Sequence, residues 1–181
     1  MGKFDYSGLL ACGENTYISH QTEIKRPHLS KIGRNVAIDS YTYCTTGLDI
    51  GDHTHISPHV SIIGGERALF KTGIFCNLAA GTRIICISDA FLGDGLIGAF
   101  IPEEYKDIEV SGNVTLNNFC NVGTNAVIFP GVELKEGTVI GAGSVVRNST
   151  EPWTIYAGNP AKPIKKRNST KMTKFAGELG Y

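Results

Sequence analysis

Aliphatic residues recur at every sixth position over most of the chain, and this spacing restricts the fold more than any other feature. A period of six is not helical, because 3.6 residues per turn would scatter these positions around a cylinder and leave no apolar stripe. It suits short strands separated by tight corners. The most regular run comes late in the sequence, at Leu116, Val122, Ile128, Leu134, Ile140 and Val146.

The same spacing is present earlier, and three such hexads make one triangular coil. The aliphatic positions of successive coils then stack in three columns at a spacing of about 4.8 Å. Glycine often follows the aliphatic residue, as in Ile32-Gly33 and Val122-Gly123, and gives the backbone the freedom that sharp corners require. We therefore predict an all-β fold, a parallel β-helix of hexapeptide repeats. The earlier positions are Cys12, Ile18, Ile24, Ile32, Ile38, Cys44, Ile50, Ile56, Ile62, Thr72, Leu78 and Ile84.

The five cysteines fit this pattern better than they fit a metal or redox site. Cys12 and Cys44 occupy the aliphatic position of a hexad, and Cys76 and Cys120 occupy the small inward position. We expect these four to point inward as packing residues and Cys86 to lie at a corner. No Cys-x-x-Cys pair is present, so no metal is predicted.

Composition sets the class of protein. A chain of 181 residues, 41% of them hydrophobic, can bury one core without disulfides. Lys plus Arg and Asp plus Glu both number 17, which argues against nucleic acid or an anionic membrane as a partner. No apolar run is long enough for membrane insertion, so we expect a cytoplasmic protein. The expected division is a β-helix domain at 1–150 and a C-terminal tail at 151–181.

Departures from the regular spacing point to function, because the repeat itself specifies only the scaffold. The spacing stretches by two residues between Ile24 and Ile32 and by four between Ile62 and Thr72. Between Ile84 and Leu116 it reaches 32 residues, which exceeds one hexad by 26. This insertion predicts one long loop, residues 88–113, extruded from the β-helix.

The loop is too apolar for a solvated linker, and long excursions from a compact scaffold are usually functional. We expect it to pack against a neighbouring chain or the substrate, with Glu104 and Tyr105 as candidate substrate contacts. Its large apolar residues include Phe91, Phe100, Ile101 and Tyr105. After Val146 the repeat ends, and residues 168–179 are predicted to form a short helix.

Three motifs together resemble the hexapeptide-repeat acyltransferases. They are the hexads, the sequence Gly-Ala-Gly-Ser-Val-Val at 141–146, and Pro152-Trp153 leading into Ala-Gly-Asn-Pro-Ala-Lys at 157–162. The likeness covers roughly residues 10–167 and is to the galactoside and surface-polysaccharide type of sugar O- and N-acetyltransferase. It implies a left-handed β-helix and a homotrimer with active sites between adjacent helices. It also implies acetyl-CoA as cosubstrate, lying along the coils, and a sugar or nucleotide-linked sugar as acceptor.

The chain departs from this family at the catalytic histidine. Galactoside acetyltransferases carry that residue in the loop before the late coils, and residues 88–113 contain no histidine. Relatives with a Ser-Asp-Asp-Phe loop have a histidine that matches His55. Here the loop reads Ser88-Asp89-Ala90-Phe91, so Asp89 is its one remaining acidic residue in this motif.

Strand alternation predicts that His55 points outward while Thr54 and Ile56 point inward. Coil stacking places Asn77 and Asn121 in the same outward column, as candidate substrate contacts. His55 is then the candidate general base, since its ordinary pKa lies near neutral pH. The alternatives are a solvated surface histidine, or one that only positions the substrate. Asp89 falls on another face, so pairing it with His55 would require a neighbouring subunit.

The CoA site needs backbone donors and small residues along the pantetheine and cations near the phosphates. The basic cluster at 165–167 could equally be an ordinary solvated tail. The candidate cofactor-binding residues are Gly123, Gly141, Ala142, Lys162, Lys165 and Arg167.

Two other readings share the scaffold. A γ-class carbonic anhydrase binds zinc through histidines of adjacent subunits. However, His53, His55 and His59 are expected to point in different directions, and no histidine follows them. A noncatalytic scaffold protein would have no use for the tail motif at 157–162. The sequence leaves open the identity of the sugar, its nucleotide linkage and the choice between O- and N-acetylation.

Overall fold

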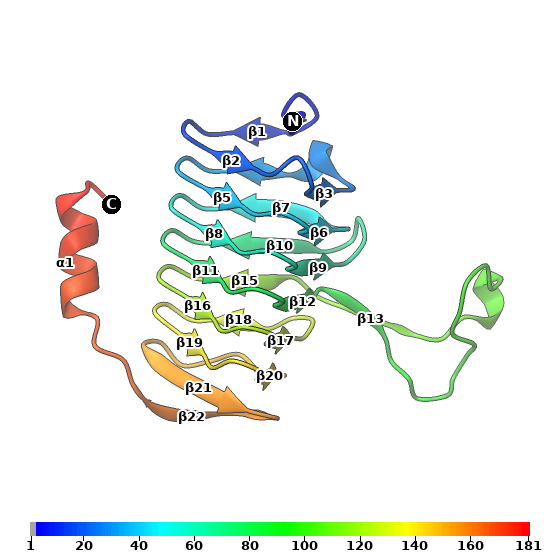
Figure 1. Ribbon diagram of the computed structural model, residues 1–181. Coiled ribbons are helices and arrows are strands. Elements are labelled where there is room, and N and C mark those ends of the chain that lie inside the picture. Colours follow the sequence, from blue (N-terminus) through cyan, green and yellow to red (C-terminus); the bar gives the residue numbers. More distant parts are fainter. Residues whose placement is uncertain (1–2) are drawn as a thin grey trace.

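The computed structural model describes residues 3–181 and shows a stack of triangular coils, with one arm and one helix projecting from it (Figure 1). Each coil contributes one short strand to each of three sheets. Sheet A contains β1 (Ala11–Cys12), β4 (Lys31–Ile32), β7 (Gly47–Ile50), β10 (Leu69–Thr72), β15 (Val114–Leu116) and β18 (Glu133–Leu134). Sheet B contains β2 (Tyr17–Ile18), β5 (Ala37–Ile38), β8 (His55–Ile56), β11 (Asn77–Leu78), β16 (Asn121–Val122), β19 (Val139–Ile140), β21 (Thr154–Gly158) and β22 (Ala161–Lys166). Sheet C contains β3 (Glu23–Ile24), β6 (Tyr43–Cys44), β9 (Ser61–Ile63), β12 (Arg83–Ile85), β17 (Val127–Ile128) and β20 (Val145–Val146).

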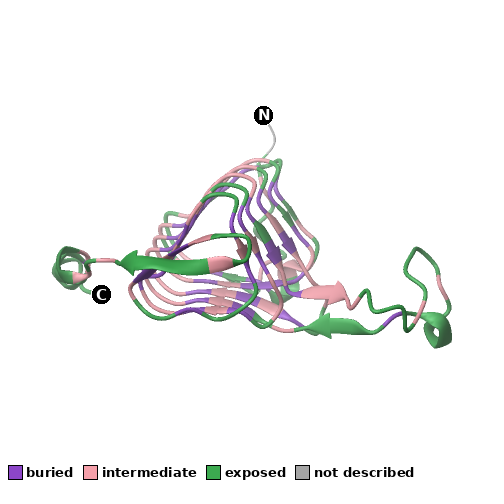
Figure 2. Ribbon diagram, turned by 90° about the horizontal axis from the view of Figure 1, so that it is seen from below, coloured by how far each residue is buried: buried purple, intermediate pink, exposed green. Residues whose placement is uncertain are grey.

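The core is formed by the predicted columns of aliphatic side chains. Ile38 pairs with Ile56, which pairs with Leu78, in parallel register along sheet B. These side chains are fully buried, and buried residues recur along the sides of the triangle in Figure 2. Each pairing repeats an apolar contact at the coil spacing, so burial of apolar area accumulates coil by coil. The prediction of a left-handed parallel β-helix is confirmed.

The stacked triangular coils form a three-sided prism. The edge of this prism between sheets A and B carries a column of stacked rings. We call this column the aromatic edge and define it as His53, Phe75, Phe119, Gly137 and Trp153. Every one of these residues has a positive φ, between 49° and 68°. A positive φ costs conformational free energy for any residue other than glycine. The stacking of the rings offsets that cost. Gly137 is required there, because a Cβ would lie 2.3 Å from the Trp153 ring.

The insertions lie where the spacing predicted them. The two-residue stretch forms a 3-10 turn, η1 (Pro27–Leu29). The long insertion leaves the coils as β13 (Ile87–Asp89) and returns as β14 (Glu109–Ser111), which pair in antiparallel register. We call residues 87–111 the arm. It contains one further 3-10 turn, η2 (Glu103–Tyr105), and projects away from the coils (Figure 1).

The C-terminal tail begins by extending the β-helix. β21 continues sheet B, and β22 folds back on it in antiparallel register. The chain then runs to α1 (Thr170–Glu178), which confirms the helix predicted at 168–179. Figure 1 shows this helix standing alongside the coils. In residues 3–181 no helix has the length and apolar character that a bilayer crossing needs.

The cysteine expectations need a correction at two positions. Cys86 is fully buried, although a corner position was expected, and burial raises the pKa of its thiol to about 11. Cys12 is exposed, because it lies in the first coil, where no earlier strand covers it. Cys44, Cys76 and Cys120 are buried as expected. Burial raises the pKa of each of these three thiols to about 12, so their role is packing.

Candidate active site

His55 lies on the outer face of sheet B at the start of β8. Thr54 and Ile56 are buried and His55 is exposed, as the alternation predicted. His55 pairs with Asn77, and Asn77 pairs with Asn121, so the three side chains form one outward column. The predicted polar ladder is therefore present.

Asp39 is a partner of His55 that the sequence analysis missed. The His55 Nε2 atom lies 2.8 Å from Asp39 Oδ2. Both side chains are partly open to solvent, at 48% and 30% exposure, so the pair is accessible to a substrate. Asp39 follows β5 and its N–H donates to the Ile56 carbonyl, which places it one coil above His55 and diagonally across from it.

This hydrogen bond fixes the state of the imidazole. An ionised carboxylate only accepts hydrogen bonds, so the Nε2 atom of His55 carries the hydrogen. In the neutral ring the Nδ1 atom then holds the free lone pair. His55 is thus oriented as a proton acceptor at Nδ1, with Asp39 able to stabilise the imidazolium that forms.

A column of small residues continues along the same side of sheet B toward the C-terminus. We call it the small-residue edge: the residue that follows the buried apolar residue of each strand of sheet B from β8 to β21. From β8 to β19 the backbone N–H of this residue bonds to a carbonyl of the next coil, which stacks the column in register. The members are Ser57, Ala79, Gly123, Gly141 and Ala157.

Coil packing explains the two glycines of this edge. A Cβ on Gly123 would lie 2.5 Å from the Ala142 nitrogen, and one on Gly141 would lie 2.9 Å from the Ala157 Cβ. The close approach of successive coils therefore requires glycine at both positions. A consequence is that the edge presents backbone and no large side chain. Ala142 is exposed beside Gly141.

The basic residues proposed for the CoA site differ in their exposure to solvent. Lys162 and Lys165 are exposed on β22, at the C-terminal end of sheet B. Arg167 is half-buried, and its Nη1 atom donates to the carbonyls of Phe119 at 2.7 Å and Gly137 at 3.0 Å. Burial lowers the pKa of the Arg167 guanidinium. These carbonyl contacts tie the Arg167 side chain to the aromatic edge.

The arm candidates lie away from His55 within one protomer. Asp89 is half-buried in β13, at the base of the arm, where it lines a cavity of about 420 Å³ together with Phe129 and Arg147. Glu104 and Tyr105 are exposed in η2, far out on the arm (Figure 1). The structure therefore brings His55, Asn77 and Asn121 together and keeps the arm candidates apart from them.

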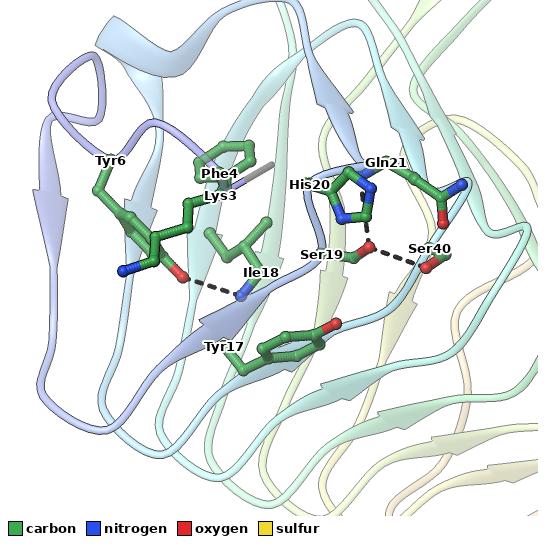
Figure 3. Close-up of a pocket in the computed structure, with 9 residues that line it drawn as sticks. All are labelled: Lys3, Phe4, Tyr6, Tyr17, Ile18, Ser19, His20, Gln21 and Ser40. Atoms are coloured by element: carbon green, nitrogen blue, oxygen red, sulfur yellow. Dashed lines mark hydrogen bonds between the residues drawn. The ribbon is translucent and has the colours of Figure 1, made fainter. Parts of the chain in front are cut away.

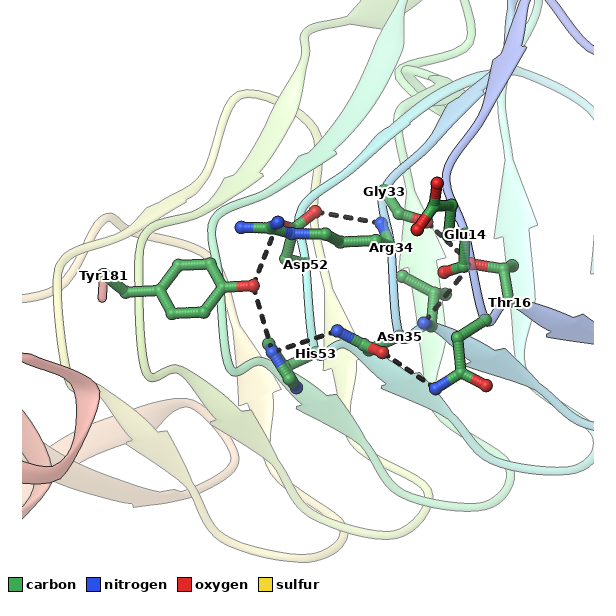
Figure 4. Close-up of polar contacts among 10 residues, drawn as sticks. Glu14, Thr16, Gly33, Arg34, Asn35, Asp52, His53 and Tyr181 are labelled. Carbon is green, nitrogen blue, oxygen red and sulfur yellow. Dashed lines mark hydrogen bonds and ion pairs between the residues drawn. The ribbon is translucent and has the colours of Figure 1, made fainter. Parts of the chain in front are cut away.

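His53 belongs to a different cluster, shown in Figure 4. Its ring stacks on Phe75 at 4.7 Å, and its Nε2 atom lies 3.1 Å from the Tyr181 hydroxyl. That hydroxyl also donates to Asp52, which forms an ion pair with Arg34 at 2.8 Å. Burial acts to raise the pKa of Asp52, but the hydrogen bonds from Arg34 and Tyr181 outweigh it and hold that pKa below its ordinary value.

The histidines do not form a metal site. His53 lies on the aromatic edge, His55 lies on the face of sheet B, and His59 stacks on Tyr41 at the corner leading to sheet C. Within residues 3–181 no group of three or more His, Cys, Asp and Glu side chains is arranged to hold a metal ion. The three histidines therefore point in different directions, as the sequence analysis expected.

Comparison with known proteins identifies the family. No family model matches the chain. The dTDP-4-amino-4,6-dideoxy-D-glucose acyltransferase of Escherichia coli is 32% identical over 164 residues, which cover 89% of this chain and 84% of that protein. The putative lipopolysaccharide biosynthesis O-acetyl transferase WbbJ of Escherichia coli K12 is 30% identical over 150 residues, which cover 80% and 68%.

A solved structure agrees over nearly the whole chain. AntD, an N-acyltransferase from Bacillus cereus in complex with dTDP and 3-hydroxybutyryl-CoA, superposes with a TM-score of 0.89 at 32% identity. The match covers 96% of this chain and 93% of that one. The coil architecture and the similarity to these relatives show that the chain belongs to the hexapeptide-repeat sugar acyltransferases.

Proposed function

We propose that this protein transfers an acetyl group from acetyl-CoA to the amino group of a nucleotide-linked amino sugar. The observation that carries the proposal is the pair of His55 and Asp39 on an open face of sheet B, in a chain of this family. A relative named for dTDP-4-amino-4,6-dideoxy-D-glucose and another solved with dTDP favour a dTDP-linked amine as acceptor.

The proposed step uses His55 as general base. The acceptor nitrogen attacks the thioester carbonyl, the C–S bond breaks, and the CoA sulfur leaves as the amide forms. The proton lost by nitrogen passes to the Nδ1 atom of His55, whose Nε2–H is held by Asp39. Asn77 and Asn121 stand in the same outward column as His55, which supports a role for them in holding the thioester or the sugar.

The small-residue edge supplies a route for acetyl-CoA. It descends from Ser57, beside the catalytic pair, through Gly123 and Gly141 to Ala157 near the C-terminal end. These four coil steps span about 19 Å at the spacing of stacked strands, which suits an extended pantetheine arm. Lys162 and Lys165 at the far end are the cations available for the CoA phosphates.

The arm supports a homotrimer. Several of its large apolar side chains have little cover within one protomer: Phe100 is fully exposed, and Phe91 and Leu92 are 67% and 77% exposed. Apolar surface of this extent on one excursion is typical of a protein contact. We propose that the arm packs on a neighbouring copy and brings its Asp89 cavity to the groove between them. Because both proposed substrates are phosphorylated metabolites, we propose the cytoplasm as the compartment.

A screen of acceptors tests the function. The purified protein is incubated with acetyl-CoA and one acceptor at a time, and thiol release and product mass are followed. We expect turnover with dTDP-4-amino-4,6-dideoxyglucose and an added mass on its nitrogen. Turnover with a hydroxyl sugar, such as a free glycoside, and none with any nucleotide-linked amine would overturn the proposal.

A shortened arm tests the assembly. Residues 90–107 are replaced by a short Gly-Ser turn that joins β13 to β14, and the molar mass is measured by light scattering. We expect the intact chain to run as a trimer and the shortened chain to run as a smaller species with its β-structure retained. A full-length chain that is monomeric at micromolar concentration contradicts the trimer.

A further inference from the structure

Two aromatic residues of the arm have a costly backbone conformation without the contact that offsets it elsewhere. Phe91 and Phe100 have φ values of 58° and 59°, which bulky residues rarely adopt. The other aromatic residues with a positive φ all contact a second ring, either along the aromatic edge or in the stack of Tyr41 on His59. Within residues 3–181 no ring stacks on Phe91 or Phe100.

Of these two rings, Phe100 has the fewer contacts in its own protomer. Phe91 borders the cavity at the base of the arm together with Phe129, and its N–H donates to the Asp107 carboxylate at 2.9 Å. Phe100 lies on the outer part of the arm and is fully exposed. Backbone strain of this kind is found where a binding contact uses it. The conformation of Phe100 therefore indicates a contact outside its own chain.

The aromatic edge carries an apolar pocket of the size that one such ring needs. The pocket lies between α1 and the edge and has a volume of about 170 Å³. An apolar cavity of roughly 150 Å³ is enough to hold benzene. The pocket opens to solvent, because Phe175 and Leu179 at its rim are 55% and 64% exposed. The lining residues are all apolar: Phe75, Phe119, Met172, Phe175, Ala176 and Leu179.

Two larger cavities are less suited to a phenyl ring. The cavity at the first coils, shown in Figure 3, is about 420 Å³ and is lined in part by Ser19, Gln21 and Ser40. Glu66 and Arg67 line another cavity, of about 290 Å³. A ring seated in either one would take polar groups out of water without giving them a hydrogen-bond partner, which costs free energy.

The arm and the pocket lie at two different corners of the prism. The arm leaves the coils between sheets C and A, and the pocket lies at the edge between sheets A and B. Figure 2 shows the arm and α1 projecting from opposite sides of the triangle, and in Figure 1 the outer part of the arm reaches the height of the lower part of α1. A contact between two different surfaces of one chain builds a ring of copies when the rotation between them closes.

We propose that Phe100 of one copy inserts into the pocket between α1 and the aromatic edge of the next copy. The inference rests on the proposed homotrimer and specifies the two surfaces that join. The pocket adjoins the candidate active site, because Phe75 lies two residues before Asn77 and no more than about 7 Å away along the chain. The arm of the neighbouring copy then stands beside the outward column that contains His55.

Photo-cross-linking tests where the Phe100 ring lies in the assembled protein. Phe100→p-azidophenylalanine keeps the ring and, under ultraviolet light, bonds to the group that lies against it. We expect covalent dimers and trimers in denaturing gels, with the link mapped by mass spectrometry to Phe119 or to residues 170–179 of a second copy. The matched control, Phe91→p-azidophenylalanine, carries the same group at the base of the arm and is expected to give no link to these residues.

Dissociation on dilution provides a second readout. Phe100→Ala is expected to raise the concentration at which half of the protein is dissociated by about tenfold or more, as loss of a buried aromatic anchor does. Leu179→Trp fills the pocket from its own side and is expected to have a similar effect. Because both changes act on one contact, the double variant should be little worse than either alone. The control Ile164→Ala removes an exposed side chain of β22 and is expected to assemble as the wild type does.

The outcomes separate this contact from the proposed assembly and from the proposed reaction. If the wild type is a trimer but the Phe100 variant links neither to Phe119 nor to residues 170–179, the contact is overturned and the trimer stands. A monomeric wild type overturns both. If the mapped link is found and no acceptor is acetylated, the contact stands and the proposed reaction is overturned.

Discussion

The aromatic edge and the small-residue edge run along the two sides of sheet B and have opposite surfaces. On the aromatic edge, Phe75 and Phe119 stack at 5.6 Å, and the C-terminal helix lies against them through Ala176 and its neighbours. On the small-residue edge, Ala79, Gly123 and Gly141 present backbone, and no helix lies over them in Figure 1. One edge is filled by rings of the chain's own side chains, while the other carries residues with a small side chain or none.

The difference between the two edges shows that the same six-residue repeat can form two kinds of surface. Both edges obey the same six-residue spacing, so the core beneath them is equivalent. What differs is the residue placed at the corner: a ring that packs on the next ring, or a residue too small to occupy the surface. The comparison predicts that changes on the aromatic edge affect stability and changes near the small-residue edge affect turnover.

The largest expected effect is on catalysis. His55→Gln removes the proton acceptor, so we expect kcat/KM to fall by about 10²- to 10⁴-fold, the usual range for a general base. Because His55 is half-exposed, the melting temperature is expected to stay near that of the wild type. Initial rates of thiol release, together with thermal denaturation, check both points.

His53→Gln is the matched control for this prediction. His53 lies on the aromatic edge, two residues away in sequence and held by Tyr181. We expect this variant to turn over as the wild type does and to lose some stability. Equal activity losses in the two variants would break the distinction between the edges.

The next effect is on stability. Phe119→Ala removes a ring that is 5% exposed and is stacked between Phe75 and Trp153. We expect a loss of about 3–5 kcal/mol in the free energy of unfolding, measured by urea titration. Activity per folded molecule should persist. Ile164→Ala on β22, where the side chain is 62% exposed, is the control and is expected to change stability by about 0.5 kcal/mol or less.

A smaller effect is expected at the exposed residue next to Gly141. Ala142→Glu places a negative charge beside the proposed path of CoA. We expect the KM for acetyl-CoA to rise about two- to fivefold, as an exposed charge contact of up to about 1 kcal/mol allows. Steady-state kinetics with Ala142→Lys as the opposite charge complete the test. If the KM for acetyl-CoA responds to neither charge, CoA takes another path.

The smallest effect concerns the contact between Tyr181 and His53, the first residue of the aromatic edge. Tyr181→Phe removes a hydroxyl that bonds to His53 and Asp52. Because the group is only partly buried, we expect a loss of about 0.5 kcal/mol in the free energy of unfolding, the lower end of the range for one hydrogen bond. Turnover should be unchanged. A fall in kcat would show that the C-terminus acts on the reaction.

Much of this fold is predictable from the sequence because its period is local and exact repetition fixes the register. The outward column of His55, Asn77 and Asn121 follows from alternation and coil stacking alone. Asp39 was missed because it contacts His55 diagonally, from the residue after the neighbouring strand. The bond between His53 and Tyr181 joins residues 128 positions apart, where no repeat gives a register.

The structure of the arm could be predicted from the sequence only in part. The break in spacing shows where it leaves the coils, and its composition shows that it is too apolar to be a solvated loop. The antiparallel pairing of β13 with β14 carries no signal in the hexads, because it depends on a contact outside the repeat. Phe91 and Phe100 are exposed in one protomer, and in the proposed trimer a neighbouring copy covers them.

A crystal structure of the protein with CoA and dTDP bound would test the central claim most directly. The account predicts CoA along Gly141, Gly123 and Ala79, with its sulfur facing the His55 ring. CoA lying on the aromatic edge or on sheet A, with its sulfur out of reach of His55, would contradict it.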